Sequence, residues 1–390
     1  MKLTDEFYRR VQERVRARLA EEGLDGMIVT VPGDVAYLIG FFYAVTERPV
    51  YLWFGRDGSR FALLPELDAE YAQAQGVHAE IRTYFEYPGV RTPEQHLADE
   101  LAKDETSLAR IGVSGALTIG AQAALADALP GSRFVRTRIL SDLRLRKEPE
   151  EIDFHRQAAE VCDEMLGAGR ALIEDALHAG RPLPTEGDLA RAVIGFGTDR
   201  MYERYAHVIY TTKLAGGLVY AGPNAARPHG LPSRRRIEIG DTLILSLGAA
   251  VGSRFVESER TFVIGQPSAE QRAYFDVALR AQEVGTQAMT VGRTCASVNA
   301  ECLDVIRDAG FGAYIRHRQG HGIGIAQHEA PWVEDGDQTL LAPGMILSSE
   351  PGIYVPGHAG YRISDSVLVT VDGPERLTRY PRTLEENTIA

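Results

Sequence analysis

Apolar residues recur at every fourth position near the start of the chain. Charged residues fill most of the segment 5–22, and its apolar residues include Phe7, Val11, Val15 and Leu19. This spacing places the apolar side chains on one face of an α-helix. Asp5 is the expected N-cap of this helix, and Gly23 is the expected stop. The pattern therefore predicts an amphipathic helix over 5–22.

Short apolar runs separated by Gly, Pro and Asp follow this helix. Such runs are typical of β-strands, and we expect strands at 25–32, 35–43, 48–55, 60–65, 109–115 and 132–138. A helical pattern lies at 121–129. Because strands and helices alternate here, the first part of the chain is predicted to form a compact α/β domain.

The pattern changes near residue 145. The run KEPEEI places Pro149 in the first turn of a long helix with acidic residues after it, which is a favoured way to begin a helix. A second helix is expected after PTEGDL. Further on, we expect strands at 205–212, 241–248, 254–264, 345–355 and 361–370, and helices at 268–290 and 295–309. We predict an α/β domain over 1–145 and an α+β domain with a largely antiparallel sheet over 146–390.

Composition excludes several classes of function. The chain has 390 residues, a formal net charge of −12 and no long basic run, which argues against a nucleic-acid partner. No segment approaches the roughly 18 apolar residues of a membrane span, and the N-terminus lacks the apolar region of a signal peptide. Three cysteines without a C-x-x-C pair predict reduced thiols in a cytoplasmic protein.

Five clusters in the second half carry residues suited to chemistry. They are GPNAARPHG with His229; the strand pair with Ser246, Glu257, Glu259 and Arg260; GHGIGIAQHE with His321 and His328; SSEPGIY with Glu350; and GYRISDS with Arg362, Ser364 and Asp365. Their order, together with AYLIGFFYAVTERP at 36–49 and KEPEEI at 147–152, resembles the creatinase, prolidase and methionine-aminopeptidase family. This resemblance implies an N-terminal creatinase-like α/β domain followed by an α+β domain of the pita-bread fold.

The resemblance also identifies positions where metal ligands are expected. Peptidases of this family hold two metal ions with two aspartates, a histidine and two glutamates. The matching positions here are Ser246, Glu257, His321, Glu350 and Ser364. A neutral hydroxyl is a poor ligand beside a carboxylate, and two neighbouring cations need bridging anions. We therefore expect no dinuclear centre.

A site that binds a single metal ion is the remaining metal-dependent alternative. Glu257, His321 and Glu350 would supply a histidine and two carboxylates, a set suited to a divalent ion such as zinc or manganese. Against it, Glu257 is one methylene longer than the aspartate that the resemblance implies. The expectation that we favour is therefore a site without a metal cofactor.

The metal-free interpretation follows the likeness to creatinase and ectoine hydrolase. The resemblance places His229 at the catalytic histidine, a general base and acid, with Glu259 or Glu350 orienting its imidazole. The other expected substrate-binding residues are Arg48, His321, His328, Glu257 and Arg362. In creatinase, the arginine at the position of Arg48 reaches into the partner subunit's site, so a homodimer is expected.

These arguments favour a hydrolase of a non-peptide C–N bond in a small zwitterionic amidine, guanidine or amide. One alternative is an Xaa-Pro dipeptidase or aminopeptidase with at most one metal ion. Another is an inactive peptide-binding protein, against which the intact His229, Glu259 and Glu350 argue. The sequence does not identify the substrate.

Overall fold

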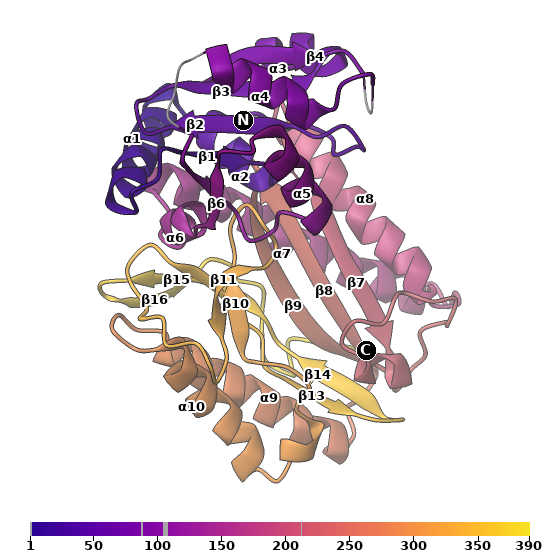
Figure 1. The fold of residues 1–390 in the computed structure, drawn as a ribbon. Coiled ribbons are helices and arrows are strands. Elements are labelled where there is room, and N and C mark those ends of the chain that lie inside the picture. The colour runs from indigo at the N-terminus through magenta and orange to yellow at the C-terminus, as the bar shows by residue number, and fades with distance from the viewer. Residues whose placement is uncertain (1, 87–88, 104–107, 212) are drawn as a thin grey trace. The chain divides into compact units, whose positions relative to one another are not determined.

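The computed structural model describes residues 2–86, 89–103, 108–211 and 213–390 (Figure 1). These residues form two compact units, Lys2–Leu143 and Arg144–Ala390. None of the helices in the described part of the chain combines the length and the hydropathy of a membrane span.

The N-terminal unit is built on one six-stranded mixed sheet with the order β4-β3-β2-β1-β5-β6. The strands are β1 (Gly26–Val29), β2 (Tyr51–Gly55), β3 (Arg60–Pro65), β4 (Glu80–Tyr84), β5 (Arg110–Val113) and β6 (Arg133–Arg136). The helical elements are α1 (Asp5–Glu21), α2 (Pro32–Ile39), η1 (Glu66–Asp68), α3 (Ala69–Ala74), α4 (Pro93–Lys103), α5 (Ile119–Ala128) and α6 (Ile139–Arg144). Buried aromatic and aliphatic side chains such as Trp53, Phe61 and Leu97 form its core.

Two details of this unit differ from the sequence-based expectations. The N-cap of α1 is Thr4, whose hydroxyl accepts from the amide of Phe7, and Asp5 is the first helical residue. The predicted strand at 35–43 is wrong, because its first half belongs to helix α2. Pro32 begins that helix, and Gly40 ends it in the left-handed conformation with φ 70°. A continuous apolar run does not distinguish a buried strand from a short buried helix.

The C-terminal unit contains the longer helices and three antiparallel or mixed sheets. Its helical elements are α7 (Pro149–His178), α8 (Glu186–Arg204), η2 (Gly222–Ala226), α9 (Ala269–Ala288), α10 (Cys295–Asp308) and η3 (Gly312–Tyr314). Its strands are β7 (Ala215–Ala221), β8 (Thr242–Val251), β9 (Arg254–Ile264), β10 (Gly320–Gly322), β11 (Glu329–Val333), β12 (Ile346–Ser349), β13 (Gly352–Val355), β14 (Ala359–Arg362), β15 (Asp365–Thr370), β16 (Gly373–Arg376) and β17 (Thr388–Ile389).

The sheets of this unit have the orders β17-β9-β8-β7, β11-β10-β12-β15-β16 and β13-β14. Helices α7 and α8 cover one face of the β7–β9 sheet, and their apolar side chains share one core with it (Figure 1). Helices α9 and α10 share a second core with β13 and β14. Pro149 is the first residue of α7, as predicted, with Glu148 and Glu151 forming a capping box.

The predicted strand at 205–212 is not observed in residues 205–211, and position 212 lies outside the described residues. The strand of this region begins later, as β7 at Ala215. The sequence patterns also missed the short strands β10 and β11, which carry or adjoin two histidines of the site described below.

Candidate active site

The long antiparallel hairpin of β8 and β9 carries half of the site. Ser246 lies opposite Glu259, and Gly248 lies opposite Glu257. Because side chains alternate along a strand, Glu257 and Glu259 leave the same face of β9. The hairpin therefore presents two carboxylates and one hydroxyl to a common space.

The second sheet supplies the other half. His321 lies on β10, Glu350 follows β12 directly, and Ser364 precedes β15 directly. The main chains of Glu259 and Ser364 exchange two hydrogen bonds of 3.0 Å, which join the two sheets. This bridge brings residues that are 107 positions apart, Ser364 and Glu257, to an oxygen separation of 3.4 Å.

His321 lies between two carboxylates. Its Nε2 atom is 3.1 Å from Glu350 Oε1 and 3.8 Å from Glu257 Oε1. Its Nδ1 atom donates to the carbonyl oxygen of Gly322 at 3.0 Å, since a carbonyl can only accept. In the neutral imidazole, Nε2 then presents a lone pair to two acceptor oxygens. This arrangement is stable only with a positive charge, a proton or a metal ion, on or beside Nε2.

The pKa values of the cluster follow from burial and close charges. Burial, assisted by Glu350, raises the pKa of Glu257 to about 8. Burial opposes the charged form of His321, but Glu257 and Glu350 outweigh it and raise the pKa of the imidazole to about 9. Burial likewise opposes ionisation of Glu350, but the adjacent imidazole of His321 holds its pKa below the usual range. The cluster therefore attracts positive charge at neutral pH.

The carboxylate of Glu259 contacts Arg362 and Ser246. Its Oε2 atom is 2.5 Å from Arg362 Nε, and its Oε1 atom accepts from the hydroxyl of Ser246. Burial raises the pKa of Glu259 to about 7, although Arg362 opposes this shift. Both side chains of the ion pair are about 5% exposed or less. Among the described residues, no hydrogen bond joins Glu259 or Glu350 to His229, so their expected orienting role is not seen in the hydrogen-bond pattern.

Two adjoining cavities open onto this cluster. One, of about 200 Å³, is lined by Ser246, Glu257 and Glu259, and the other, of about 270 Å³, by His321 and other residues. Four of the predicted residues line both cavities: His229, His328, Glu350 and Arg362. Burial, with the charge of His321, lowers the pKa of His328 to about 4, so its imidazole is neutral at neutral pH. Seven of the eight predicted site residues, all except Arg48, therefore line these two cavities together with Ser246.

Arg48 belongs to the N-terminal unit. Within that unit its guanidinium pairs with Glu86 at 2.9 Å and with the neighbouring Glu47. The hydrogen bond to Glu86 raises the pKa of the guanidinium. Arg48 is thus already paired with carboxylates of its own unit.

Several residues of the cavities were not singled out from the sequence. Lys213, Tyr220 and Gln327 line the first cavity, and His317, Arg318 and Glu334 line the second. His317 accepts or donates at 2.8 Å with the hydroxyl of Tyr354, and the Arg318 guanidinium lies 4.5 Å from the Trp332 ring. The charged run RHR at 316–318, one residue before GHGIG, was the available signal for His317 and Arg318.

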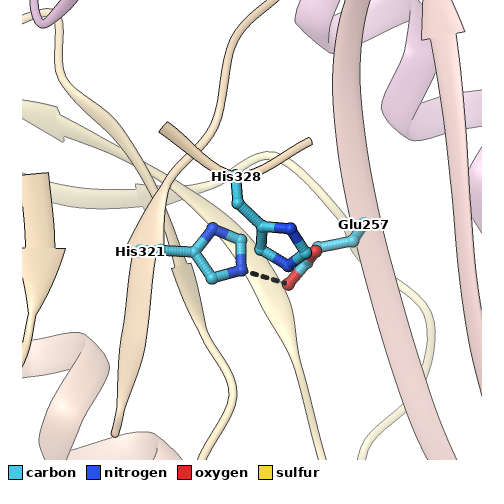
Figure 2. A group of neighbouring side chains, drawn as sticks. All are labelled: Glu257, His321 and His328. Carbon is cyan, nitrogen blue, oxygen red and sulfur yellow. Dashed lines mark ion pairs between the residues drawn. The ribbon is translucent and has the colours of Figure 1, made fainter. Parts of the chain in front are cut away.

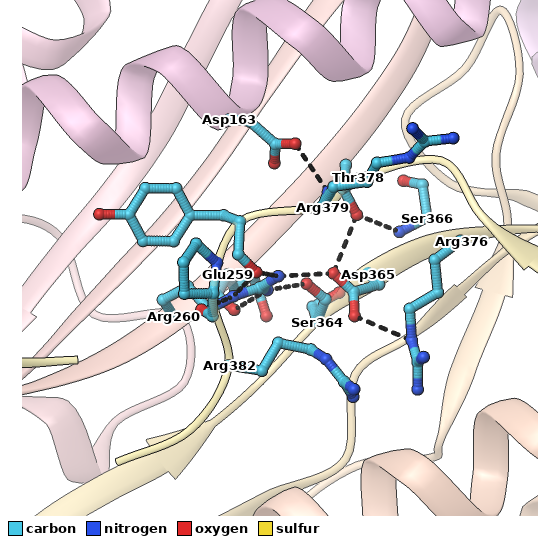
Figure 3. Close-up of polar contacts among 12 residues, drawn as sticks. Asp163, Glu259, Arg260, Ser364, Asp365, Ser366, Arg376, Thr378, Arg379 and Arg382 are labelled. Carbon is cyan, nitrogen blue, oxygen red and sulfur yellow. Dashed lines mark hydrogen bonds and ion pairs between the residues drawn. The ribbon is translucent and has the colours of Figure 1, made fainter. Parts of the chain in front are cut away.

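A buried ionic network supports the junction of the two sheets (Figure 3). Arg260 Nη2 lies 2.7 Å from Asp365 Oδ1, and both side chains are fully buried. Arg260 also donates to the carbonyl oxygen of Ser364 at 2.7 Å. Gln282 and Thr378 donate to the two oxygens of Asp365 at 3.0 and 2.9 Å. The network holds the main chain of Glu259 and Ser364 in place, because Arg260 donates to both carbonyl oxygens.

The donor set of the cluster fits one metal ion. One ligand atom from each of Glu257, His321 and His328 lies within 4.8 Å of the others (Figure 2). A second carboxylate, Glu350, lies beside His321. Imidazole and carboxylate ligands suit zinc or manganese. At the other two positions implied by the resemblance stand the hydroxyls of Ser246 and Ser364, which donate to glutamate oxygens instead.

Comparison with known proteins identifies the group to which the chain is similar. A model of metallopeptidase family M24 matches residues 153–371. A model of the creatinase/prolidase N-terminal domain matches residues 12–145. Together these matches account for most of the chain, and the predicted fold class, a creatinase-like α/β domain followed by an α+β pita-bread domain, is confirmed.

Individual relatives extend over nearly the whole chain. The probable dipeptidase PepE of Mycobacterium bovis is 33% identical over 386 residues, covering 97% of this chain and 96% of the relative. The Xaa-Pro dipeptidase of Pyrococcus furiosus is 29% identical, covering 95% and 98%. Among solved structures, dipeptidase PepE from Mycobacterium ulcerans superposes with a TM-score of 0.85 at 29% identity, covering 100% of each chain.

These relatives overturn two sequence-based expectations. The favoured function, a metal-independent hydrolase of a non-peptide C–N bond, is wrong, because the full-length relatives are named dipeptidases and the Xaa-Pro alternative is the better supported one. The expected absence of a metal cofactor is wrong as well, because the matching family is one of metallopeptidases. The physical reason is that losing two carboxylates removes ligands for a second ion but leaves Glu257, His321 and Glu350 together.

Proposed function

We propose, since this chain belongs to metallopeptidase family M24, that it hydrolyses small dipeptides of the Xaa-Pro type with the help of one divalent metal ion. The chain is a hydrolase; the dipeptide substrate and the single ion are the proposal. The observation that carries it is the buried cluster of His321 between Glu257 and Glu350, which lines two adjoining cavities.

The ion would be held by Glu257, His321 and Glu350. When bound there, it supplies a Lewis acid that polarises the scissile carbonyl and makes a bound water more acidic. The hydrogen bond from His321 Nδ1 to the Gly322 carbonyl fixes the tautomer that leaves Nε2 available as a ligand. Serine hydroxyls stand in place of further carboxylates, so we propose one ion per chain.

The chain's own residues would handle the proton that the leaving nitrogen needs. Cleavage before proline releases a secondary amine, which must be protonated as the C–N bond breaks. His229 lines both cavities and makes no hydrogen bond to another described residue, so either ring nitrogen can hold that proton. The pair of Glu259 and Arg362 is nearly charge-neutral and buried, and it would shape the cavity wall.

The proposal includes a homodimer in the cytoplasm. In this reading, Arg48 of one subunit would reach the substrate carboxylate in the partner's site, as the resemblance implies. Mixing an Arg48→Ala chain with a His229→Ala chain tests this directly, because one of the two sites in a mixed dimer would then be intact. Recovered activity is expected on mixing. Absence of recovery, with dimers present in sedimentation, would contradict the exchange.

Assays on purified chain loaded with Mn²⁺ or Zn²⁺ test the proposed reaction. We expect release of proline from Ala-Pro and Gly-Pro, and no turnover of creatine or ectoine. Glu350→Gln is expected to lower kcat/KM at least about 100-fold, because a ligand to the ion is lost. His178→Ala, which removes an exposed imidazole at the end of α7, serves as the control and should retain full activity. Failure of every dipeptide with every metal would reject the proposal.

A further inference from the structure

We propose that His328 is a ligand of the metal ion, so that this chain binds one divalent transition-metal ion with two histidines and two carboxylates: His321, His328, Glu257 and Glu350. The resemblance stated above assigned His328 to substrate binding only. The inference rests on the metal-dependent site of the proposed function, but it is independent of the dipeptide substrate.

The two imidazoles face the same point. The ring centroids of His321 and His328 are 4.1 Å apart and their planes are inclined at 67°. One nitrogen of each, with an oxygen of Glu257, forms a group of atoms within 4.8 Å of one another (Figure 2). Around a single ion with bonds of about 2.1 Å, tetrahedral ligand atoms are about 3.4 Å apart. These three ligand atoms would have to approach one another to bind one ion, and Glu350 Oε1 already lies 3.1 Å from His321 Nε2.

The Nε2 atom of His321, the buried member of this group, lacks a hydrogen-bond partner among the described residues. The side chain of His321 is 2% exposed, and within the described residues its Nε2 atom has no partner in hydrogen-bonding geometry. This atom points toward oxygens of Glu257 and Glu350 rather than toward a donor. A cation bound between these atoms and His328 would satisfy all of them.

An irregularity in the strand ladder places His328 beside His321. In the pairing of β10 with β11, His321 lies opposite Trp332, but the next residue, Gly322, lies opposite Glu329. The register shift removes two residues of β11 from the ladder. Such bulges re-aim side chains beside active sites. His328 is the residue before Glu329, and this shift in register places it beside His321.

Buried ion pairs of Glu329 hold the turn that precedes β11. The carboxylate of Glu329 pairs with Lys147 at 2.9 Å and with Arg144, and the three side chains are 12% exposed or less. A Cβ atom at Gly324 would lie only 2.2 Å from Glu329 Oε1, so the carboxylate packs directly against the preceding turn. Glu329 is therefore a positioning residue for the imidazole that precedes it.

Titration of the metal-free chain with Co²⁺ alone tests the assignment, because the visible absorption of bound Co²⁺ reports its ligands without any substrate. We expect one equivalent of Co²⁺ per wild-type chain. His328→Ala and His328→Gln should weaken binding at least about 100-fold and alter the absorption bands, since losing even an outer partner of a ligand costs 10- to 100-fold. Glu329→Gln should weaken binding by about 10-fold, and Glu329→Asp should restore part of it.

His178→Ala is the matched control, because it removes an exposed imidazole from the same unit and should leave Co²⁺ affinity and spectrum unchanged. Far-UV circular dichroism checks that each variant is folded, which is expected because His328 is exposed. Wild-type affinity and spectrum in both His328 variants would overturn the assignment while leaving the proposed dipeptidase function intact. Conversely, weakened binding in these variants supports it even if the loaded wild type hydrolyses no dipeptide.

Discussion

At the scale of single residues, the buried charges at the junction of the two sheets are compensated inside the protein. Arg260 and Asp365 are fully buried, and their partners include the main chain of Ser364 (Figure 3). A buried ion pair adds little net stability over an apolar pair, but removal of one partner leaves an uncompensated charge. The network therefore makes the junction of the sheets sensitive to single substitutions.

Asp365→Asn is expected to lower the free energy of unfolding by about 3–5 kcal/mol, because Arg260 would keep its charge in a buried position without an anion. Urea denaturation followed by circular dichroism measures this change. Glu301→Gln is the matched control: it breaks an ion pair of the same 2.7 Å length with Arg293 at the surface, where no measurable change is expected. Equal effects of the two substitutions would contradict the role of burial.

His155 gives a prediction for pH. It is fully buried, its Nδ1 atom lies 2.8 Å from the Phe255 carbonyl oxygen, and burial, with the charges of Lys147 and Arg254, lowers its pKa from 6.5 to about 3. Between these pH values the unfolded chain binds a proton that the folded chain does not bind. This residue therefore contributes stability above pH 6.5 that is lost as the pH falls toward 3.

His155→Gln removes the titration and leaves an amide that can still donate to Phe255. Relative to this variant, the wild type should lose about 1.4 kcal/mol of stability per pH unit below 6.5, and the difference should be constant above it. Denaturation of both proteins from pH 4 to 8 measures the slope. A difference that does not vary with pH would show that His155 titrates normally.

At the scale of elements, the start of α8 anchors the segment that carries His229. Glu186 is fully buried in the first turn of α8. Its carboxylate accepts from the amides of Ala221 and Ser233 at 2.8 and 2.9 Å and from the side chain of Asn224. One side chain thus ties both ends of the segment 221–233 to a helix.

Glu186→Ala should free this segment, because several buried donors lose their acceptor at a cost of about 1–3 kcal/mol. We expect faster proteolysis or hydrogen exchange within 221–233 and a fall in kcat/KM, with Co²⁺ affinity unchanged because no proposed ligand moves. Asp199→Asn, on the exposed part of α8, should change neither. Loss of Co²⁺ binding in Glu186→Ala would instead indicate a disruption of the whole site.

At the scale of the whole molecule, all four proposed ligands lie in the unit Arg144–Ala390. An ion that binds only the folded form stabilises it by about 2.7 kcal/mol when its concentration is 100 times Kd. For a unit of this size, that corresponds to a rise in Tm of roughly 5–10 °C. We expect calorimetry to show a higher Tm of the C-terminal unit with Zn²⁺ or Mn²⁺ than with a chelator.

The N-terminal unit provides an internal control for this measurement, since it holds none of the ligands. If the two units melt separately, its transition should not respond to the ion. A chelator that leaves both transitions unchanged would argue against any resident metal. The division of the chain into independently folding domains at residue 145 stays a prediction that the same calorimetry tests.

Sequence patterns were sufficient for much of the fold because they reflect local rules. The spacing of apolar residues identified α1, and Pro149 with its acidic neighbours identified the start of α7. The strands β8 and β9 were evident from continuous alternation. The strand expected at 35–43 was wrong because its apolar run fits both a strand and a buried helix, and only packing selects between them.

The identities of the site residues were likewise present in the sequence. Glu257, His321 and Glu350 follow from the resemblance, and so do the two serines that exclude the family's full ligand set. The sequence could not show whether the ligands that remain are enough to bind a metal ion. From the sequence alone, two missing carboxylates suggested that the metal was lost. The metallopeptidase relatives and the cluster of His321 with Glu350 contradict that conclusion.

Residue types and periodicity, which are local properties, thus predicted the two-part architecture, and the resemblance carried by the motifs predicted that His321, Glu257 and Glu350 belong to one site. The tertiary structure alone decided that Glu259 pairs with Arg362, that His328 turns toward His321, and that Glu329 is clamped by residues 182 and 185 positions away. These contacts arise from the register between β10 and β11 and from the bridge between the sheets, and both depend on long-range packing that no local pattern encodes.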